Sequence, residues 1–82
     1  MSTEPRIKAF IIDELRFPGS ADDLDDDYPL LEKEVLDSMG IFQVVGFLER
    51  DFGIVVEDED LIPSNFESIS GIARFVAAKK DA

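Results

Sequence analysis

An aspartate followed by a serine is the residue pair in this sequence best placed to carry chemistry. Asp37 and Ser38 open the run DSMGIFQVVGFLERDFG, whose apolar residues recur at steps of three and four, so the pair falls at the start of a predicted helix. A phosphate ester on a serine there would be favoured by the helix dipole and by the backbone N–H groups of the first turn. Because Asp and Ser are also ordinary helix caps, the pair alone does not separate a modification site from a cap.

A second candidate site is the acidic segment ADDLDDDYPLLEKEVL. Its carboxylates fall at the first, third, fifth and twelfth positions of an EF-hand calcium loop, and they are Asp23, Asp25, Asp27 and Glu34. The sixth position of such a loop needs glycine for its turn, and this chain has Tyr28 there, followed by a proline. We therefore expect a solvated acidic loop with no specific metal site, and a calcium-binding module remains an alternative.

Composition removes most enzyme classes. The 82 residues include no cysteine and no histidine, which excludes disulfides, thiolate or imidazole metal sites, and Ser-His or Cys-His catalysis. A chain of this length is too small to surround a buried active site, so we expect no catalytic residues and no enzyme activity. The net charge of −11 repels nucleic acid and anionic membranes and favours protein partners with basic surfaces.

The periodicity predicts one all-α domain over residues 1–82, with three long helices and one short helix. The long helices are expected at about Glu4–Arg16, Ser38–Phe52 and Ser68–Lys80, and one short turn at Asp58–Ile62, ended by Pro63. The residues expected to cap or stop them are Thr3, Asp37, Ser68 and Gly53. The second helix should bury the stripe Ile41, Val44, Val45, Leu48 and Phe52.

A long loop should connect the first two long helices, from Pro18 to about Asp37. It holds too many apolar residues for a free linker, namely Leu24, Tyr28, Leu30, Leu31, Val35 and Leu36. We expect these side chains to pack across the bundle, which favours an ordered, functional loop.

The exposed face of the second long helix should carry a docking surface for protein partners. This face reads Met39, Phe42, Gln43, Gly46, Glu49 and Arg50, so it is apolar at its start and holds few acids. Met39 and Phe42 are predicted to be exposed anchors beside Ser38, whereas Phe47 is predicted to widen the core. Glu49 and the acidic run over residues 57–60 should add electrostatic steering.

The whole chain resembles the acyl and peptidyl carrier protein family, in the order helix, long loop, D-S-[LM] opening a second helix, short third helix, fourth helix. The segments VLDSMGIFQVVGFLERDFGI and LIPSNFESISGIARFV carry the resemblance, which is strongest to free-standing D-alanyl and aminoacyl carriers. It implies a four-helix acyl-carrier-type bundle. It also implies a 4′-phosphopantetheine arm, derived from coenzyme A, on Ser38 and a part for Met39 in docking. Because every partner must approach the serine end of the second helix, we expect Asp37, Met39 and Phe42 to form the contact surface, with Glu49 assisting.

The resemblance further implies a stand-alone carrier that holds acyl or aminoacyl groups as thioesters. The implied partners are a phosphopantetheinyl transferase, an adenylating ligase or acyltransferase, and a downstream condensing or transfer enzyme. Fatty-acid carriers typically line the exposed face of this helix with acids, whereas here that face is apolar at its start. The resemblance therefore favours a dedicated pathway, of the secondary-metabolite, nonribosomal-peptide-like or cell-envelope kind. A carrier of primary fatty-acid synthesis is the alternative.

The remaining expectations follow from what the sequence lacks. No apolar run reaches the roughly 20 residues that cross a bilayer, so we expect a cytoplasmic protein without stable membrane association. We also expect a monomer. An acidic interaction module without a prosthetic group is the rival interpretation, and such a module would not need the serine at the helix start.

Overall fold

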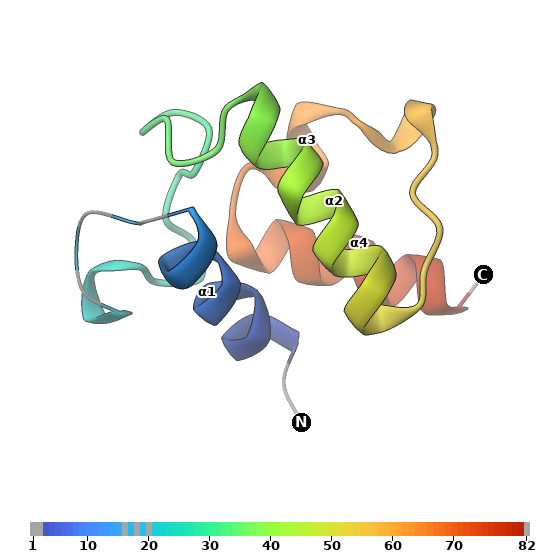
Figure 1. The fold of residues 1–82 in the computed structure, drawn as a ribbon, viewed down its shortest axis with the longest axis horizontal. Helices are drawn as coiled ribbons and strands as arrows, with labels where there is room; N and C mark the ends of the chain where they lie inside the picture. The colour runs from blue at the N-terminus through green and yellow to red at the C-terminus, as the bar shows by residue number, and fades with distance from the viewer. Residues whose placement is uncertain (1–2, 16, 18, 20, 82) are drawn as a thin grey trace.

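The computed structural model describes residues 3–81 except 16, 18 and 20, and within them it contains helices and no strand. In chain order the elements are α1 (Thr3–Glu14), the 3-10 turn η1 (Ala21–Asp23), α2 (Ser38–Phe52), the 3-10 turn η2 (Asp58–Asp60), α3 (Pro63–Phe66) and α4 (Ile69–Asp81). The predicted all-α bundle with a long first loop is confirmed. In Figure 1, α2 crosses in front of α4, and α1 lies beside both.

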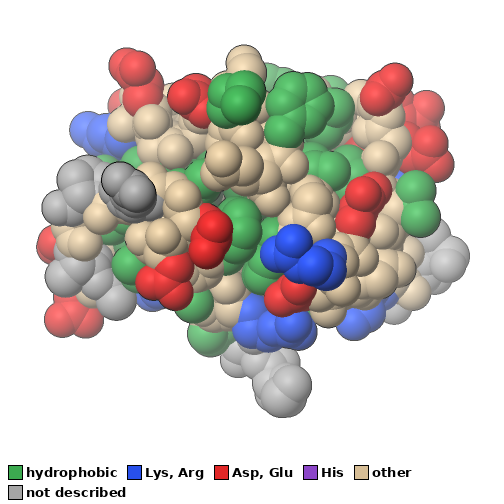
Figure 2. All heavy atoms as spheres, viewed as in Figure 1, with side chains coloured by type: hydrophobic (Ala, Val, Ile, Leu, Met, Phe, Trp, Pro, Cys, Tyr) green, Lys and Arg blue, Asp and Glu red, His purple; other side chains and the backbone are tan. Residues whose placement is uncertain are grey.

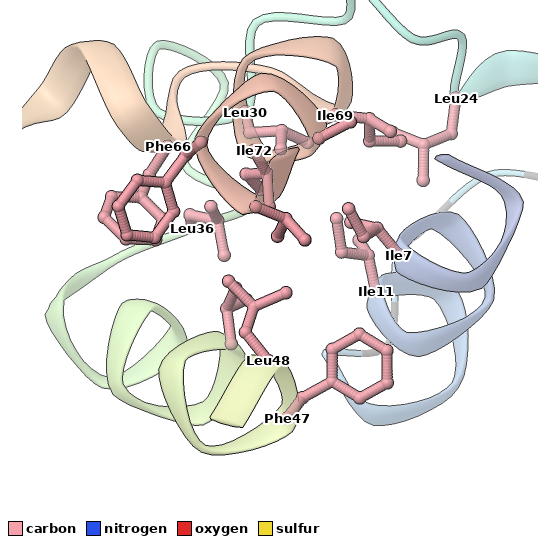
Figure 3. Packing of buried hydrophobic residues seen from close by; sticks show 14 of the residues in the cluster. Ile7, Ile11, Leu24, Leu30, Leu36, Phe47, Leu48, Phe66, Ile69 and Ile72 are labelled. Atoms are coloured by element: carbon pink, nitrogen blue, oxygen red, sulfur yellow. The ribbon is translucent and has the colours of Figure 1, made fainter. Parts of the chain in front are cut away.

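The core forms where the apolar faces of α1, α2 and α4 meet. Ile7 and Ile11 of α1 point toward Leu48 of α2 and Ile72 of α4, as Figure 3 shows, and all four side chains are fully buried. Because each isoleucine or leucine removed from water stabilises the fold by about 1.5–3 kcal/mol, this contact between helices distant in sequence is a main source of stability.

The buried stripe of α2 is rotated from the predicted one. Val44 and Leu48 are buried as expected, whereas Ile41, Val45 and Phe52 are only partly buried. Phe47 is buried instead, and its ring stacks on that of Phe10 with a centroid distance of 4.4 Å. The buried stripe is rotated because α1 covers the Phe47 side of α2. The prediction that Phe47 belongs to the core is confirmed.

Three of the four predicted capping residues act as predicted. Asp37 Oδ1 accepts the N–H of Gly40 at 2.8 Å, and Ser68 Oγ accepts the N–H of Gly71 at 3.0 Å. Gly53 ends α2 with φ of 69°, a left-handed conformation that glycine adopts without strain. The prediction for Thr3 is wrong, because α1 already includes this residue.

The other end of α1 also differs from its prediction. α1 ends at Glu14, and the N–H of Leu15 still bonds the carbonyl of Ile11 at 3.1 Å. The predicted last residue, Arg16, lies outside the described residues, as does Pro18, which was expected to stop the helix.

The long loop packs across the bundle as predicted. Leu24, Leu30 and Leu36 are buried in the same core as the helices, and the other three apolar residues of the loop are partly buried. Backbone hydrogen bonds fix the loop to the start of α4: the N–H of Leu30 donates to the carbonyl of Glu67 at 2.8 Å, and that of Ser70 to the carbonyl of Asp26 at 2.9 Å. The loop is therefore a structural layer that leads the chain to Ser38.

The prediction for the short third helix is wrong in part. The 3-10 turn η2 lies within the predicted Asp58–Ile62 turn, but Pro63 begins α3 instead of ending a helix. Proline suits the first helical position, since its fixed φ is helical and its missing N–H would have no partner there.

The acidic loop does not assemble a metal site within the described part of the chain. No group of three or more carboxylates lies close enough there to hold a metal ion. Asp27 accepts a hydrogen bond from Ser70 Oγ at 3.1 Å, which joins it to α4. The described helices also include none that is long and apolar enough to cross a bilayer.

An ion pair joins the α2–α4 connection to the end of α4. Lys79 Nζ lies 2.7 Å from Asp60 Oδ2, and the same oxygen accepts the N–H of Glu57 at 3.0 Å. The hydrogen bond from Lys79, helped by that from Glu57, lowers the pKa of Asp60 below its usual value, and the bond to Asp60 raises the pKa of Lys79. The ionised pair therefore holds η2 against α4.

Asp60→Asn is expected to lower the urea midpoint of unfolding at neutral pH, since asparagine can still accept the Glu57 N–H but carries no charge for Lys79. A carboxylate whose folded pKa is lowered stabilises the fold above its unfolded pKa of about 3.9, and the effect is lost as pH falls through the folded value. The difference in urea midpoint between Asp60→Asn and wild type should therefore vanish in acid. Asp58→Asn removes the same charge from an exposed position, and an equal loss in that control would contradict a specific role for the pair.

Candidate functional site

Ser38 is the first residue of α2 and is exposed to solvent. Asp37 precedes it in an extended conformation, with φ of −110° and ψ of −169°, and caps the helix through its side chain. The first N–H groups of a helix have no carbonyl partner inside the helix, so their positive ends surround an anion held at this position. The N–H of Gly40 already donates to Asp37 Oδ1, but the positive end of the helix dipole still favours a phosphoester on Ser38 Oγ, and the remainder of a bound group would extend into solvent.

Gly40 is a site residue that the sequence analysis missed. A Cβ at this position would lie 3.3 Å from Leu36 Cδ2 and 3.4 Å from Asp37 Oδ1, closer than most such contacts. Its lack of a side chain lets the buried Leu36 and the capping carboxylate approach the first turn of α2. A glycine in an otherwise helical pattern was the available signal.

Two large apolar side chains stand exposed beside Ser38. Met39 is 68% exposed and Phe42 is 64% exposed, as the docking prediction required. Figure 2 shows hydrophobic side chains gathered at the upper edge, over the first half of α2. Two more exposed apolar residues, which the sequence analysis did not single out, follow in the α2–α4 connection: Val55 at 66% and Ile62 at 47%. The structure thus brings Asp37, Met39 and Phe42 together around the serine.

Glu49 lies apart from this group. It is 11 residues beyond Ser38, about 16 Å along the helix axis at 1.5 Å per residue. Its Oε2 accepts the N–H of Val56 at 2.9 Å, which fixes the chain that leaves α2. Glu49 therefore has a structural contact of its own, and its contribution to steering stays a prediction, as does that of residues 57–60.

Comparison with known proteins decides the family. A family model described as the phosphopantetheine attachment site matches residues 5–76, nearly the whole chain. The chain belongs to this phosphopantetheine-binding carrier family. It is 31% identical over 62 residues to the probable acyl carrier protein PigG of Serratia sp. (strain ATCC 39006), a match that covers 76% of this chain and 71% of that protein.

A solved structure shares the fold. A chain in the crystal structure of an FAD-dependent dehydrogenase is similar, with a TM-score of 0.76 and 30% sequence identity. The similarity covers 85% of this chain and 97% of that chain. Membership of the family means that this carrier protein holds a covalently attached phosphopantetheine group.

Proposed function

We propose that this carrier protein acts as a stand-alone tether with no catalysis of its own, and that Ser38 Oγ is its attachment point. The observation that carries the proposal is the position of Ser38, exposed and first in α2, directly after the capping Asp37. The positive end of the α2 dipole favours a phosphoester there, and a transferase can reach the exposed hydroxyl from solvent.

The protein's own part in the chemistry is small. Ser38 Oγ loses its proton and forms the new P–O bond, while the adenosine bisphosphate part of coenzyme A leaves. The attached group supplies a thiol that holds acyl or aminoacyl cargo as a thioester. A tether raises the concentration of cargo at each enzyme to the millimolar range and prevents its loss by diffusion.

The test is attachment of the arm in vitro. The purified protein is incubated with coenzyme A and a broad-specificity phosphopantetheinyl transferase, and its intact mass is measured. We expect the mass of one arm to be added. A protein of unchanged mass after complete conversion of a known carrier under the same conditions would contradict the proposal.

We further propose that the cargo belongs to a dedicated pathway in which a flavin enzyme oxidises it on the arm, after loading by an adenylating ligase. The similar chain in the dehydrogenase structure has about 70 residues, given that 97% of it matches 85% of this chain. A helical chain of that length has no room for a dinucleotide-binding sheet, which supports its being a carrier bound to the dehydrogenase. The exposed face of α2 is apolar at its start, which fits a partner of a dedicated pathway. Fatty-acid carriers, by contrast, typically present a face lined with acids.

This pathway assignment is tested with loaded protein. A broad-specificity transferase attaches arms that already bear acyl or aminoacyl groups, and the products are mixed with the FAD-dependent dehydrogenase of the similar structure. We expect one cargo class to lose two hydrogen atoms while the flavin is reduced, seen by mass and by bleaching of flavin absorbance. Efficient malonylation and elongation by a housekeeping fatty-acid system, with no flavin reduction, would overturn the assignment.

Met39 and Phe42 are proposed as the anchors of the partner interface, because every enzyme must approach the Ser38 end of α2. Truncating a central apolar anchor costs about 1–3 kcal/mol of binding. We expect Met39→Ala and Phe42→Ala each to lower kcat/KM for arm attachment by about tenfold or more, while the melting temperature changes little, since both side chains lie mostly in solvent. Val55→Ala is the control, as an equally exposed apolar residue on another segment. A large loss of melting temperature with normal kinetics would show that the two residues stabilise the fold instead.

A further inference from the structure

The end of α2 that lies opposite Ser38 is surrounded by cations. The guanidinium carbon of Arg6 lies 4.3 Å from the centroid of the Phe52 ring, and Lys80 Nζ lies 5.9 Å from it. Arg6 belongs to the start of α1 and Lys80 to the end of α4, so three helices meet at Phe52. Figure 2 shows Lys and Arg side chains gathered in the lower half of the view, over this end of α2. A chain with a net charge of −11 thus concentrates cations at one end.

These cations are only partly neutralised by the protein itself. Asp51 Oδ1 lies 3.3 Å from Arg50 Nε, and Asp51 Oδ2 lies 3.6 Å from Arg6 Nη2, so two guanidinium groups share one carboxylate. Lys80 forms no ion pair with any side chain that the structure describes. We call Arg6, Arg50, Lys80 and Phe52 the cationic end. Its three charged side chains are exposed, so they can pair with a partner's acids.

A hollow of about 440 Å³ adjoins Phe52 at this end. Phe52 and Val55 line it on one side and Lys79 and Lys80 on another, and Val55 is 66% exposed. Lys79 is already held in an ion pair, which leaves Lys80 to meet a ligand. Glu57 is the one acid among the described lining residues. The hollow therefore offers apolar surface beside a cation, which suits an apolar side chain that has a carboxylate next to it in its own chain.

The cationic end is well separated from the attachment serine. Phe52 is 14 residues beyond Ser38, about 21 Å along the helix axis at 1.5 Å per residue. A partner that covers about 800 Å² centred on Ser38, a disc of about 16 Å radius, does not reach Phe52. A protein bound at the cationic end therefore leaves the serine open to a second one.

We propose that the cationic end is a second docking surface, which binds an acidic peptide segment of a partner protein. Carboxylates of the segment pair with Arg6 and Lys80, and an apolar side chain between them enters the hollow beside Phe52. The charge of the surface is opposite to that of the protein as a whole, so it selects acidic segments that the remainder of the molecule repels. This inference goes beyond the proposed function, because nothing in it depends on Ser38.

The experiment uses two fluorescent octapeptides as probes, one alternating glutamate with leucine and one alternating glutamine with leucine. Binding is followed by fluorescence anisotropy in about 0.15 M salt, where exposed charges more than about 8 Å apart are largely screened from each other. Acids elsewhere on the protein then contribute little, whereas contacts at the cationic end remain. We expect saturable binding of the glutamate peptide, at least about fivefold tighter than that of the glutamine peptide.

Matched variants test which cations matter. Lys80→Glu should weaken binding of the glutamate peptide about fivefold, and Arg6→Gln about threefold. Lys33→Glu and Arg74→Gln make the same changes at exposed cations on other segments, and both should bind the peptide as wild type does. All four positions are exposed, so the variants should fold, which a thermal melt checks.

Backbone amide NMR locates the bound peptide. We expect the signals of residues 50–55 and 79–80 to shift while those of residues 38–42 stay in place. Equal binding of the two peptides, equal losses in Lys80→Glu and Lys33→Glu, or shifts confined to residues 38–42 would each overturn the inference. Ser38→Ala should bind the glutamate peptide as wild type does, so a failure of arm attachment would overturn the proposed function and leave this surface in place.

Discussion

Ser38→Ala is expected to abolish attachment of the phosphopantetheine arm while leaving the fold intact. The exposed hydroxyl is the proposed nucleophile, whereas the helix cap is supplied by the side chain of Asp37, which the substitution does not touch. Alanine is a good helix former at the first position of α2, and exposed substitutions away from caps usually change stability by less than about 0.5 kcal/mol. Intact mass after treatment with transferase and coenzyme A, together with a thermal melt followed by circular dichroism, measures both effects.

A second serine provides a control for whether the loss of attachment is specific to Ser38. Ser64 is also exposed and lies in the first turn of a helix, α3. Ser64→Ala should therefore accept one arm at the wild-type rate. An arm that persists on the Ser38→Ala protein would place the attachment elsewhere and remove the central residue of the proposed function.

The sequence was most informative where one local interaction determines the structure. The caps at Asp37 and Ser68 and the stop at Gly53 were predicted because each depends on a few neighbouring residues. Pro63 was misinterpreted, since a proline can either end a helix or begin one, and only the packing of Phe66 against the core decides between them. The rotation of the α2 stripe had the same kind of cause: nothing local to α2 reveals which side α1 will cover.

The candidate site was predicted in part for the same reason. Ser38, Met39 and Phe42 are close in sequence, so a single helix brings them together without help from the remainder of the fold. The contact of Glu49 with Val56 depends on how the chain leaves α2, and a helical pattern does not show it. Gly40 and Gly46 look alike in sequence, and only the atoms around them distinguish a glycine needed for packing from one that packing does not need.

Leu30→Ala is expected to remove much of the stability of the protein although the residue lies in a loop. Leu30 is fully buried, and its N–H donates to the carbonyl of Glu67 just before α4. Leucine-to-alanine changes in a core cost about 2–5 kcal/mol. A domain of 82 residues has a total stability of about 4–12 kcal/mol at the usual 0.05–0.15 kcal/mol per residue. Urea unfolding should therefore show a much lower midpoint, with a large unfolded population at 37 °C.

Leu31→Ala is the matched control, because it removes the same atoms from the neighbouring residue, which is only partly buried. We expect the control to lose well under half as much stability as Leu30→Ala, since less of its side chain leaves water on folding. The loop ends at Asp37, so loosening it should also disturb the helix start that presents Ser38, and Leu30→Ala should accept the arm more slowly. Equal losses in the two variants would mean that the loop only covers the surface of the bundle, and that the helices alone hold the attachment site in place.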